Sequence, residues 1–115
     1  MITRPSGRIP EERTNMRGGD GTVVMESYLE KSLFPKHFRV FCEIVLEPGC
    51  SIGEHTHEGE CEVFRITEGE GVYGDNGVEK TVSAGDVTVC FSGESHSIAN
   101  RSDKTLKLFA AVITE

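Results

Sequence analysis

The chain contains no tryptophan, and apolar residues make up only 37% of its 115 residues. A chain of this length forms one domain with a modest hydrophobic core, so we expect a homodimer to supply extra stability. No apolar run is long enough to cross a bilayer, and the first residues show no signal-peptide pattern. A membrane partner is therefore excluded, and a cytoplasmic location is expected.

Basic residues are also scarce, with 12 Lys and Arg against 19 Asp and Glu, for a formal net charge of −7. This balance argues against nucleic acid as a partner, because nucleic-acid-binding domains carry basic patches. The cysteines form no CxxC pair, which excludes a zinc-finger type of site. Without a secretion signal, free thiols are expected in place of disulfides. The four cysteines are Cys42, Cys50, Cys61 and Cys90.

Glycine, by contrast, is abundant, and helical periodicity is rare. Thirteen glycines and alternating apolar residues favour many short strands joined by turns. A turn is expected over residues 69–71, and Asn76-Gly77 predicts a tight hairpin. About ten short strands in regular order predict an all-β sandwich or barrel. The predicted strands include residues 22–29, 38–46, 51–57, 62–67, 78–82, 87–91, 96–99 and 106–114.

Residues 1–21 differ from the rest, because they are polar and rich in glycine, proline and arginine. One interpretation is a solvated, loosely packed arm. The other is an arm whose arginines lie across an acidic partner subunit, since residues 43–70 hold eight glutamates and only one arginine or lysine, Arg65. The expected organisation is an N-terminal arm, 1–21, and a single domain, 22–115. The arginines of the arm are Arg4, Arg8, Arg13 and Arg17.

The chemistry concentrates in three histidines and one glutamate. His55 and His57 are two positions apart on a predicted strand, so their side chains point to one face. With Glu62 and His96 they form a set of nitrogen and oxygen donors without a thiolate. Such a set suits one Mn²⁺, Fe²⁺, Co²⁺, Ni²⁺ or Zn²⁺ ion per chain rather than a cysteine-rich structural zinc. His57 and Glu62 can both face inward only if a bend at 58–60 separates two strands.

The glycines around these donors recur at fixed distances from them in the sequence. From Gly49 to Gly69 the chain reads glycine, five residues, HxH, four residues, Glu, six residues, glycine. A second stretch runs from Gly85 through Phe91-Ser92-Gly93 to His96 and Asn100. These stretches resemble the two cupin motifs, with Phe91 where the family has proline. The resemblance spans residues 49–100 and is to small oxalate-decarboxylase-like cupins. It implies a single-domain jelly-roll β-barrel with the four donors as ligands inside.

Four protein ligands leave one or two positions open on a five- or six-coordinate metal. The resemblance therefore implies a metal-dependent enzyme, with manganese among the candidate metals, that acts on a small carboxylate or sugar-like substrate. The alternative is a non-catalytic module that binds or senses a small molecule at the metal. Glu94, in the loop before His96, is a candidate catalytic acid or base, and its plainer interpretation is an exposed loop glutamate.

Three other residues near the motifs have expected orientations. Arg39 could bind an anionic substrate if its side chain faces inward. Arg65 alternates with Glu62 along one strand, so it should face outward. Cys61 is adjacent to Glu62 and should point away from the metal, so we expect no role for it as a ligand or nucleophile.

Overall fold

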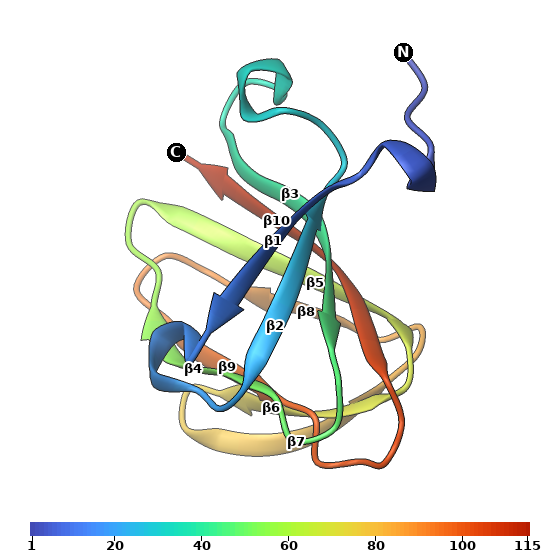
Figure 1. The fold of residues 1–115 in the computed structure, drawn as a ribbon. Helices are drawn as coiled ribbons and strands as arrows, with labels where there is room; N and C mark the ends of the chain where they lie inside the picture. Colours follow the sequence, from blue (N-terminus) through green and yellow to red (C-terminus); the bar gives the residue numbers. More distant parts are fainter.

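The computed structural model describes residues 1–115 as strands and short 3₁₀ turns, without an α-helix (Figure 1). None of its helical turns has the length or apolar character needed to traverse a bilayer. The 3₁₀ turns are η1 (Pro5–Gly7), η2 (Met16–Gly18) and η3 (Lys31–Leu33). The strands are β1 (Ile9–Thr14), β2 (Thr22–Ser27), β3 (Phe38–Leu46), β4 (Ser51–Thr56), β5 (Glu60–Glu68), β6 (Glu70–Asp75), β7 (Val78–Ser83), β8 (Val87–Cys90), β9 (Ser95–Ala99) and β10 (Leu106–Thr114).

The strands form two antiparallel sheets with a jelly-roll arrangement. One sheet has six strands in the order β1-β2-β3-β10-β5-β8, and the other has four in the order β4-β9-β6-β7. Strands distant in sequence are neighbours in both sheets, as a jelly roll requires. The predicted all-β class and jelly roll are confirmed. The two sheets remain separate ladders, however, so the structure is a two-layer sandwich and not a barrel closed by hydrogen bonds.

The core lies between the two sheets and follows from the period-two alternation of the strands. On β3, the side chains of Cys42, Ile44 and Leu46 are buried, and the intervening residues are partly exposed. The paired strand β10 contributes Leu106 and Leu108, which are fully buried. The other members of this apolar cluster are Val23, Ile52, Phe64, Ile66, Tyr73, Val82, Ile98 and Ala110.

The N-terminal segment contains a strand that the sequence analysis did not predict. Strand β1 pairs with β2 from Ile9 opposite Ser27 to Thr14 opposite Thr22, and it forms one edge of the larger sheet (Figure 1). All six of its residues are exposed, and Pro10 is tolerated because an edge strand needs fewer ladder hydrogen bonds. Six of the first 21 residues therefore belong to a sheet. The division into an arm and a domain stays a prediction.

Two turn predictions have different outcomes. Asn76 and Gly77 both have positive φ, at 50° and 85°, and join β6 to β7 as a tight hairpin, as predicted. The predicted turn over residues 69–71 is wrong in extent, because only Gly69 separates β5 from β6, and Gly71 lies within β6. Gly69 has a φ of 83°, and a Cβ there would clash with the carbonyl oxygen of Thr105. The positive φ permits the one-residue connection, and the close approach of Thr105 excludes a side chain there.

Candidate metal centre

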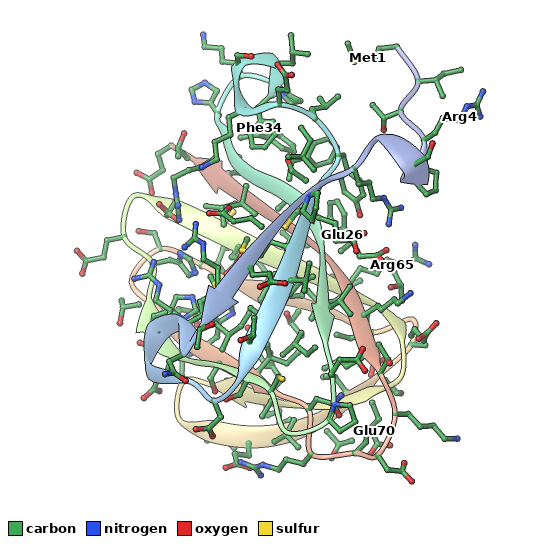
Figure 2. The ribbon with its side chains drawn as sticks, viewed as in Figure 1. Met1, Arg4, Glu26, Phe34, Arg65 and Glu70 are labelled. Carbon is green, nitrogen blue, oxygen red and sulfur yellow. The ribbon has the colours of Figure 1, made fainter.

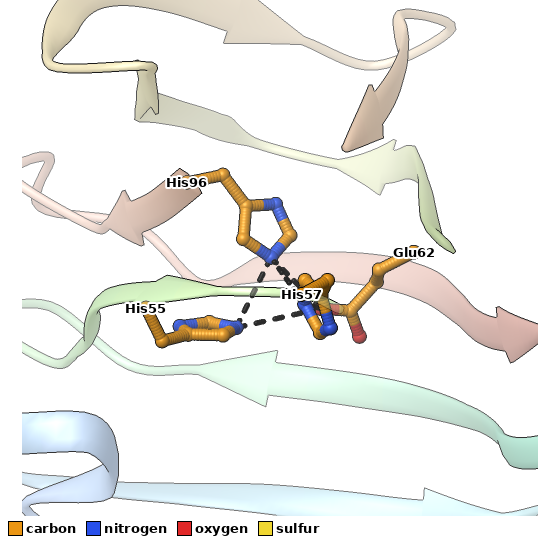
Figure 3. Close-up of side chains that lie close together, drawn as sticks. All are labelled: His55, His57, Glu62 and His96. Carbon is orange, nitrogen blue, oxygen red and sulfur yellow. Dashed lines mark hydrogen bonds and ion pairs between the residues drawn. The ribbon is translucent and has the colours of Figure 1, made fainter. Parts of the chain in front are cut away.

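The two sheets bring the four predicted donors together at one place (Figure 3). His55 on β4 lies directly opposite His96 on β9, and Glu62 comes from β5 of the other sheet. His57 follows β4, in the bend that ends at the start of β5. This bend resets the alternation, so both His57 and Glu62 are buried, as the sequence analysis required. One donor atom from each residue lies within 4.8 Å of all the others.

The donor atoms converge through the Nε2 nitrogens of the three imidazoles. Nε2 of His96 lies 3.1 Å from Nε2 of both His55 and His57. Oε1 of Glu62 lies 2.9 Å from Nε2 of His96, 3.0 Å from that of His57 and 3.7 Å from that of His55. Ligands at right angles around a metal, with bonds of about 2.1 Å, are about 3 Å apart. The spacing therefore fits one metal ion.

The outer nitrogen of each imidazole has its own partner. Nδ1 of His55 donates to the carbonyl oxygen of Gly53 at 2.8 Å, and Nδ1 of His57 donates to Oε2 of Glu60 at 2.9 Å. Nδ1 of His96 lies 2.9 Å from the hydroxyl of Tyr73. A carbonyl and a carboxylate only accept, so the neutral rings of His55 and His57 present their lone pairs at Nε2. Such outer partners orient metal-binding histidines.

The protonation states of Glu62 and the three histidines also favour binding of a cation. Burial would raise the pKa of Glu62, but the three imidazoles around its carboxylate outweigh that effect and hold the pKa well below its usual range. Burial lowers the pKa of His96, whereas the neighbouring carboxylate of Glu62 stabilises the protonated ring of His57 and raises its pKa. The site thus contains a buried ionised carboxylate facing imidazole nitrogens, which is costly without a compensating positive charge. A divalent metal would supply it, so the residues fit the predicted ion.

A cavity of about 380 Å³ adjoins the donors. Its wall includes His55, His57 and Glu62, and the guanidinium-bearing residues Arg13, Arg17 and Arg39. Arg39 was expected to matter only if it faced inward, and it does line the cavity. Arg13 and Arg17 were missed, because nothing local in the sequence links them to the donors. The other lining residues are Thr14, Met16, Met25, Val40, Ile44, Ile52 and Val112.

A model of the cupin domain family matches residues 42–112, which include all four donors. The chain belongs to the cupin family. This cupin is 45% identical over 113 residues to an oxalate-binding protein of Thermotoga maritima, covering 98% of this chain and 93% of that protein. The family resemblance read from the two motifs is confirmed.

Solved structures agree with this assignment. The crystal structure of a Thermotoga maritima protein described as a predicted oxalate decarboxylase matches this cupin with a TM-score of 0.94 and 44% identity, and both chains are fully covered. A cupin barrel domain protein of Salinispora arenicola has a TM-score of 0.71 at 22% identity, covering 98% of this chain and 88% of that one. The second likeness concerns the fold alone.

Glu94 does not join the donors of this cupin. Its carboxylate accepts hydrogen bonds from the backbone N–H of Phe91 and from Nδ2 of Asn76, both at 2.9 Å. Its carbonyl oxygen accepts from the N–H of His57 at 3.1 Å. Glu94 therefore braces the loop beside His57, and its carboxylate is not part of the cavity wall. A catalytic role for Glu94 stays a prediction.

Two residues outside the predicted donor set, Glu60 and Tyr73, support the donors instead. Glu60 holds His57 and also pairs with Arg39, whose Nη2 lies 2.7 Å from Oε2. The hydroxyl of Tyr73 touches His96, and the ring of Tyr73 packs edge-on to that imidazole. The position of Glu60, three residues after His57, was the only local signal.

The remaining expectations concern residues around the donors. Cys61 lies outside the donor group and is partly exposed, in contrast to the buried Glu62 beside it. All four cysteines are free thiols. Arg65 is exposed, on the outer side of β5, as alternation predicted (Figure 2).

Proposed function

We propose that this cupin holds one divalent transition metal through His55, His57, Glu62 and His96, and through it binds a small dicarboxylate, with oxalate the first candidate. The observation that carries the proposal is the convergence of three Nε2 atoms and one carboxylate oxygen within 4.8 Å. Mn²⁺, Fe²⁺, Co²⁺, Ni²⁺ and Zn²⁺ all accept such donors. When bound, the metal would offer open positions to two oxygens of a chelating ligand.

The surroundings of the donors favour an anionic ligand. Three arginines line the cavity of a protein whose overall net charge is −7, and one of them, Arg17, has no carboxylate partner, so the cavity wall offers guanidinium groups to an anion. The oxalate-binding relative, at 45% identity over nearly the whole chain, supports oxalate as the first ligand to test. Apolar side chains, among them Val40 and Ile52, line the rest of the cavity.

Binding without turnover is supported by what the cavity wall contains. Apart from the donors, its titratable side chains are arginines, which remain protonated at neutral pH and are poor acid–base catalysts. The second candidate is a metal-dependent enzyme acting on a small oxygen-rich substrate. Its support is the similarity to the predicted oxalate decarboxylase and the open positions that four protein ligands leave.

The experiment combines metal analysis with ligand binding. Purified protein should contain up to one divalent metal ion per chain, and oxalate should raise its Tm with metal and not after chelation. Product analysis with oxalate then separates the two candidates, because formate or carbon dioxide at more than one equivalent per chain shows an enzyme. An oxalate-induced shift that persists after complete metal removal would overturn the metal-dependent mode.

We also propose that the protein is a homodimer. Strand β8 is an edge of the larger sheet, and Val87, Val89 and the following Phe91 are exposed to 58%, 38% and 62%. Apolar side chains at an unpaired strand edge favour association with another chain. Light scattering at micromolar concentration should give twice the chain mass of 12.6 kDa. The single chain mass would contradict the proposal.

A further inference from the structure

The three arginines of the cavity differ in how their charge is balanced. Nε of Arg13 lies 3.0 Å from Oε1 of Glu11, and Arg39 forms two hydrogen bonds with the carboxylate of Glu60, at 3.1 and 2.7 Å. Arg17 forms no ion pair or side-chain hydrogen bond in the structure. Its guanidinium is therefore the cationic group of the cavity wall that has no carboxylate partner.

The backbone around Arg17 is fixed on the strand that carries a donor. Turn η2 packs against β4, where the N–H of Ser51 donates to the carbonyl of Asp20 at 2.8 Å, and Oγ of Ser51 accepts from the N–H of Asp20 at 2.8 Å. A Cβ on Gly53 would clash with the carbonyl oxygen of Arg17, and a Cβ on Gly19 would clash with that of Ser51. The contact thus requires glycine on both sides.

Arg17 itself has an unusual backbone conformation. Its φ is 54° and its ψ is 30°, in the left-handed region that residues with a side chain rarely adopt. Such a conformation persists when surrounding contacts enforce it, and it is frequent where a side chain must be presented to a ligand. The contacts of Gly19 and Gly53 enforce it here.

The same glycine links Arg17 to the donors. The carbonyl oxygen of Gly53 accepts the Nδ1 proton of His55, while its Cα lies against the carbonyl of Arg17. The backbone that carries Arg17 is therefore held against the strand segment that orients His55, and both residues line the cavity. The exposed side chain of Arg17 thus starts from a fixed backbone position, which reduces the ordering needed when it binds an anion.

The net charge of the metal-loaded site matches a ligand with two negative charges. A divalent metal on neutral imidazoles and the ionised Glu62 leaves one positive charge. The pairs of Arg13 with Glu11 and of Arg39 with Glu60 are neutral, and Arg17 adds a second positive charge. Oxalate carries two negative charges, and when it chelates through one oxygen of each carboxylate its other two oxygens face away from the metal.

We infer that Arg17 is the specificity-determining residue of the site, which binds the outer oxygens of a chelated dicarboxylate through its planar guanidinium. This inference rests on the proposed function, since it assigns a partner to the ligand proposed there. Because Arg17 belongs to residues 1–21, the polar N-terminal segment would contribute to ligand specificity. Guanidinium groups match two carboxylate oxygens at once, whereas a lysine ammonium does not.

The test compares two chelators on metal-loaded protein by calorimetry. Oxalate presents carboxylate oxygens outward, whereas acetohydroxamate chelates through two oxygens and presents a methyl group. Arg17→Ala should weaken oxalate binding about tenfold or more, the effect of losing a charge-assisted hydrogen bond, and leave acetohydroxamate affinity and metal stoichiometry unchanged. Arg17→Lys should recover part of the oxalate affinity. Arg65→Ala, which removes an exposed arginine outside the cavity wall, is the matched control and should change neither.

The outcomes separate this inference from the function on which it rests. Wild-type affinity for oxalate in Arg17→Ala would overturn the role of Arg17, and so would an equal loss for both chelators, which indicates a general disturbance of the site. If metal-loaded wild-type protein binds acetohydroxamate and not oxalate, the proposed function fails before any variant is measured.

Discussion

The imidazole of His57 donates its Nδ1 proton to Oε2 of Glu60 at 2.9 Å, and Arg39 holds the same carboxylate. The carboxylate thereby fixes which nitrogen of His57 is free to bind a metal. The hydrogen bond with Arg39 keeps the pKa of Glu60 below its usual range, so the carboxylate stays ionised around neutral pH. Glu60 is not a donor itself, yet it sets the orientation and tautomer of one.

From this pair we predict that Glu60→Ala lowers metal affinity about 10- to 100-fold, the usual effect of removing the outer partner of a metal-binding histidine. Competition with a chromophoric chelator measures the affinity. Glu58→Ala is the control, because Glu58 is an exposed glutamate near the same bend and makes no such hydrogen bond. Equal affinities in both variants would show that Glu60 does not support the donor.

A second prediction distinguishes Glu62 from its neighbour Cys61. Glu62→Gln should reduce metal content sharply, because a neutral amide is a much weaker ligand for a divalent ion than a carboxylate. Cys61→Ser should retain full metal content, since its side chain lies outside the donor group. Metal analysis of the two variants side by side gives the answer. Loss of metal in Cys61→Ser alone would require a site rebuilt around the thiol.

A third prediction concerns acid. Imidazole must be neutral to bind a metal, so protons compete with the ion as the pH falls, first at His57, whose pKa is raised, and then at His96, whose pKa is lowered. The pKa of Glu62 lies far lower, so this carboxylate remains ionised there and does not cause the change. Metal affinity should be highest at pH 8 and fall steadily as the pH is lowered to 5. A flat profile across that range would exclude imidazole ligands.

The fourth prediction uses the cysteines. Burial raises the pKa of Cys42 to about 12 and that of Cys90 to about 11, so both remain protonated thiols at pH 8. Only the thiolate is an effective nucleophile. Iodoacetamide at pH 8 should therefore modify Cys50 and Cys61, which are partly exposed, and leave the other two intact in folded protein. Peptide mass spectrometry reads the result, and unfolded protein, in which all four react, is the control. Rapid labelling of Cys42 would mean that the core opens.

Several features of this protein follow from the sequence through local rules. Strands β3 and β10 have the predicted bounds, because each is a nine-residue segment rich in apolar and β-branched residues, which is a strong strand signal. The donors His55, His57, Glu62 and His96 could be named from motif spacing, and the bend before Glu62 followed from strand phase.

Tertiary structure decided the rest, because the deciding contacts join residues far apart in the chain. Strand β1 has no apolar alternation and exists through its pairing with β2. The arginines of the N-terminal segment looked like those of a tail, yet two of them line the cavity. Arg13 is placed by the pairing of β1 with β2, and Arg17 by the docking of η2 on β4 where Gly19 and Gly53 meet. Local propensity carries no information about such a contact. The sequence determined which residues are suited to hold a metal, and packing determined which charges surround it.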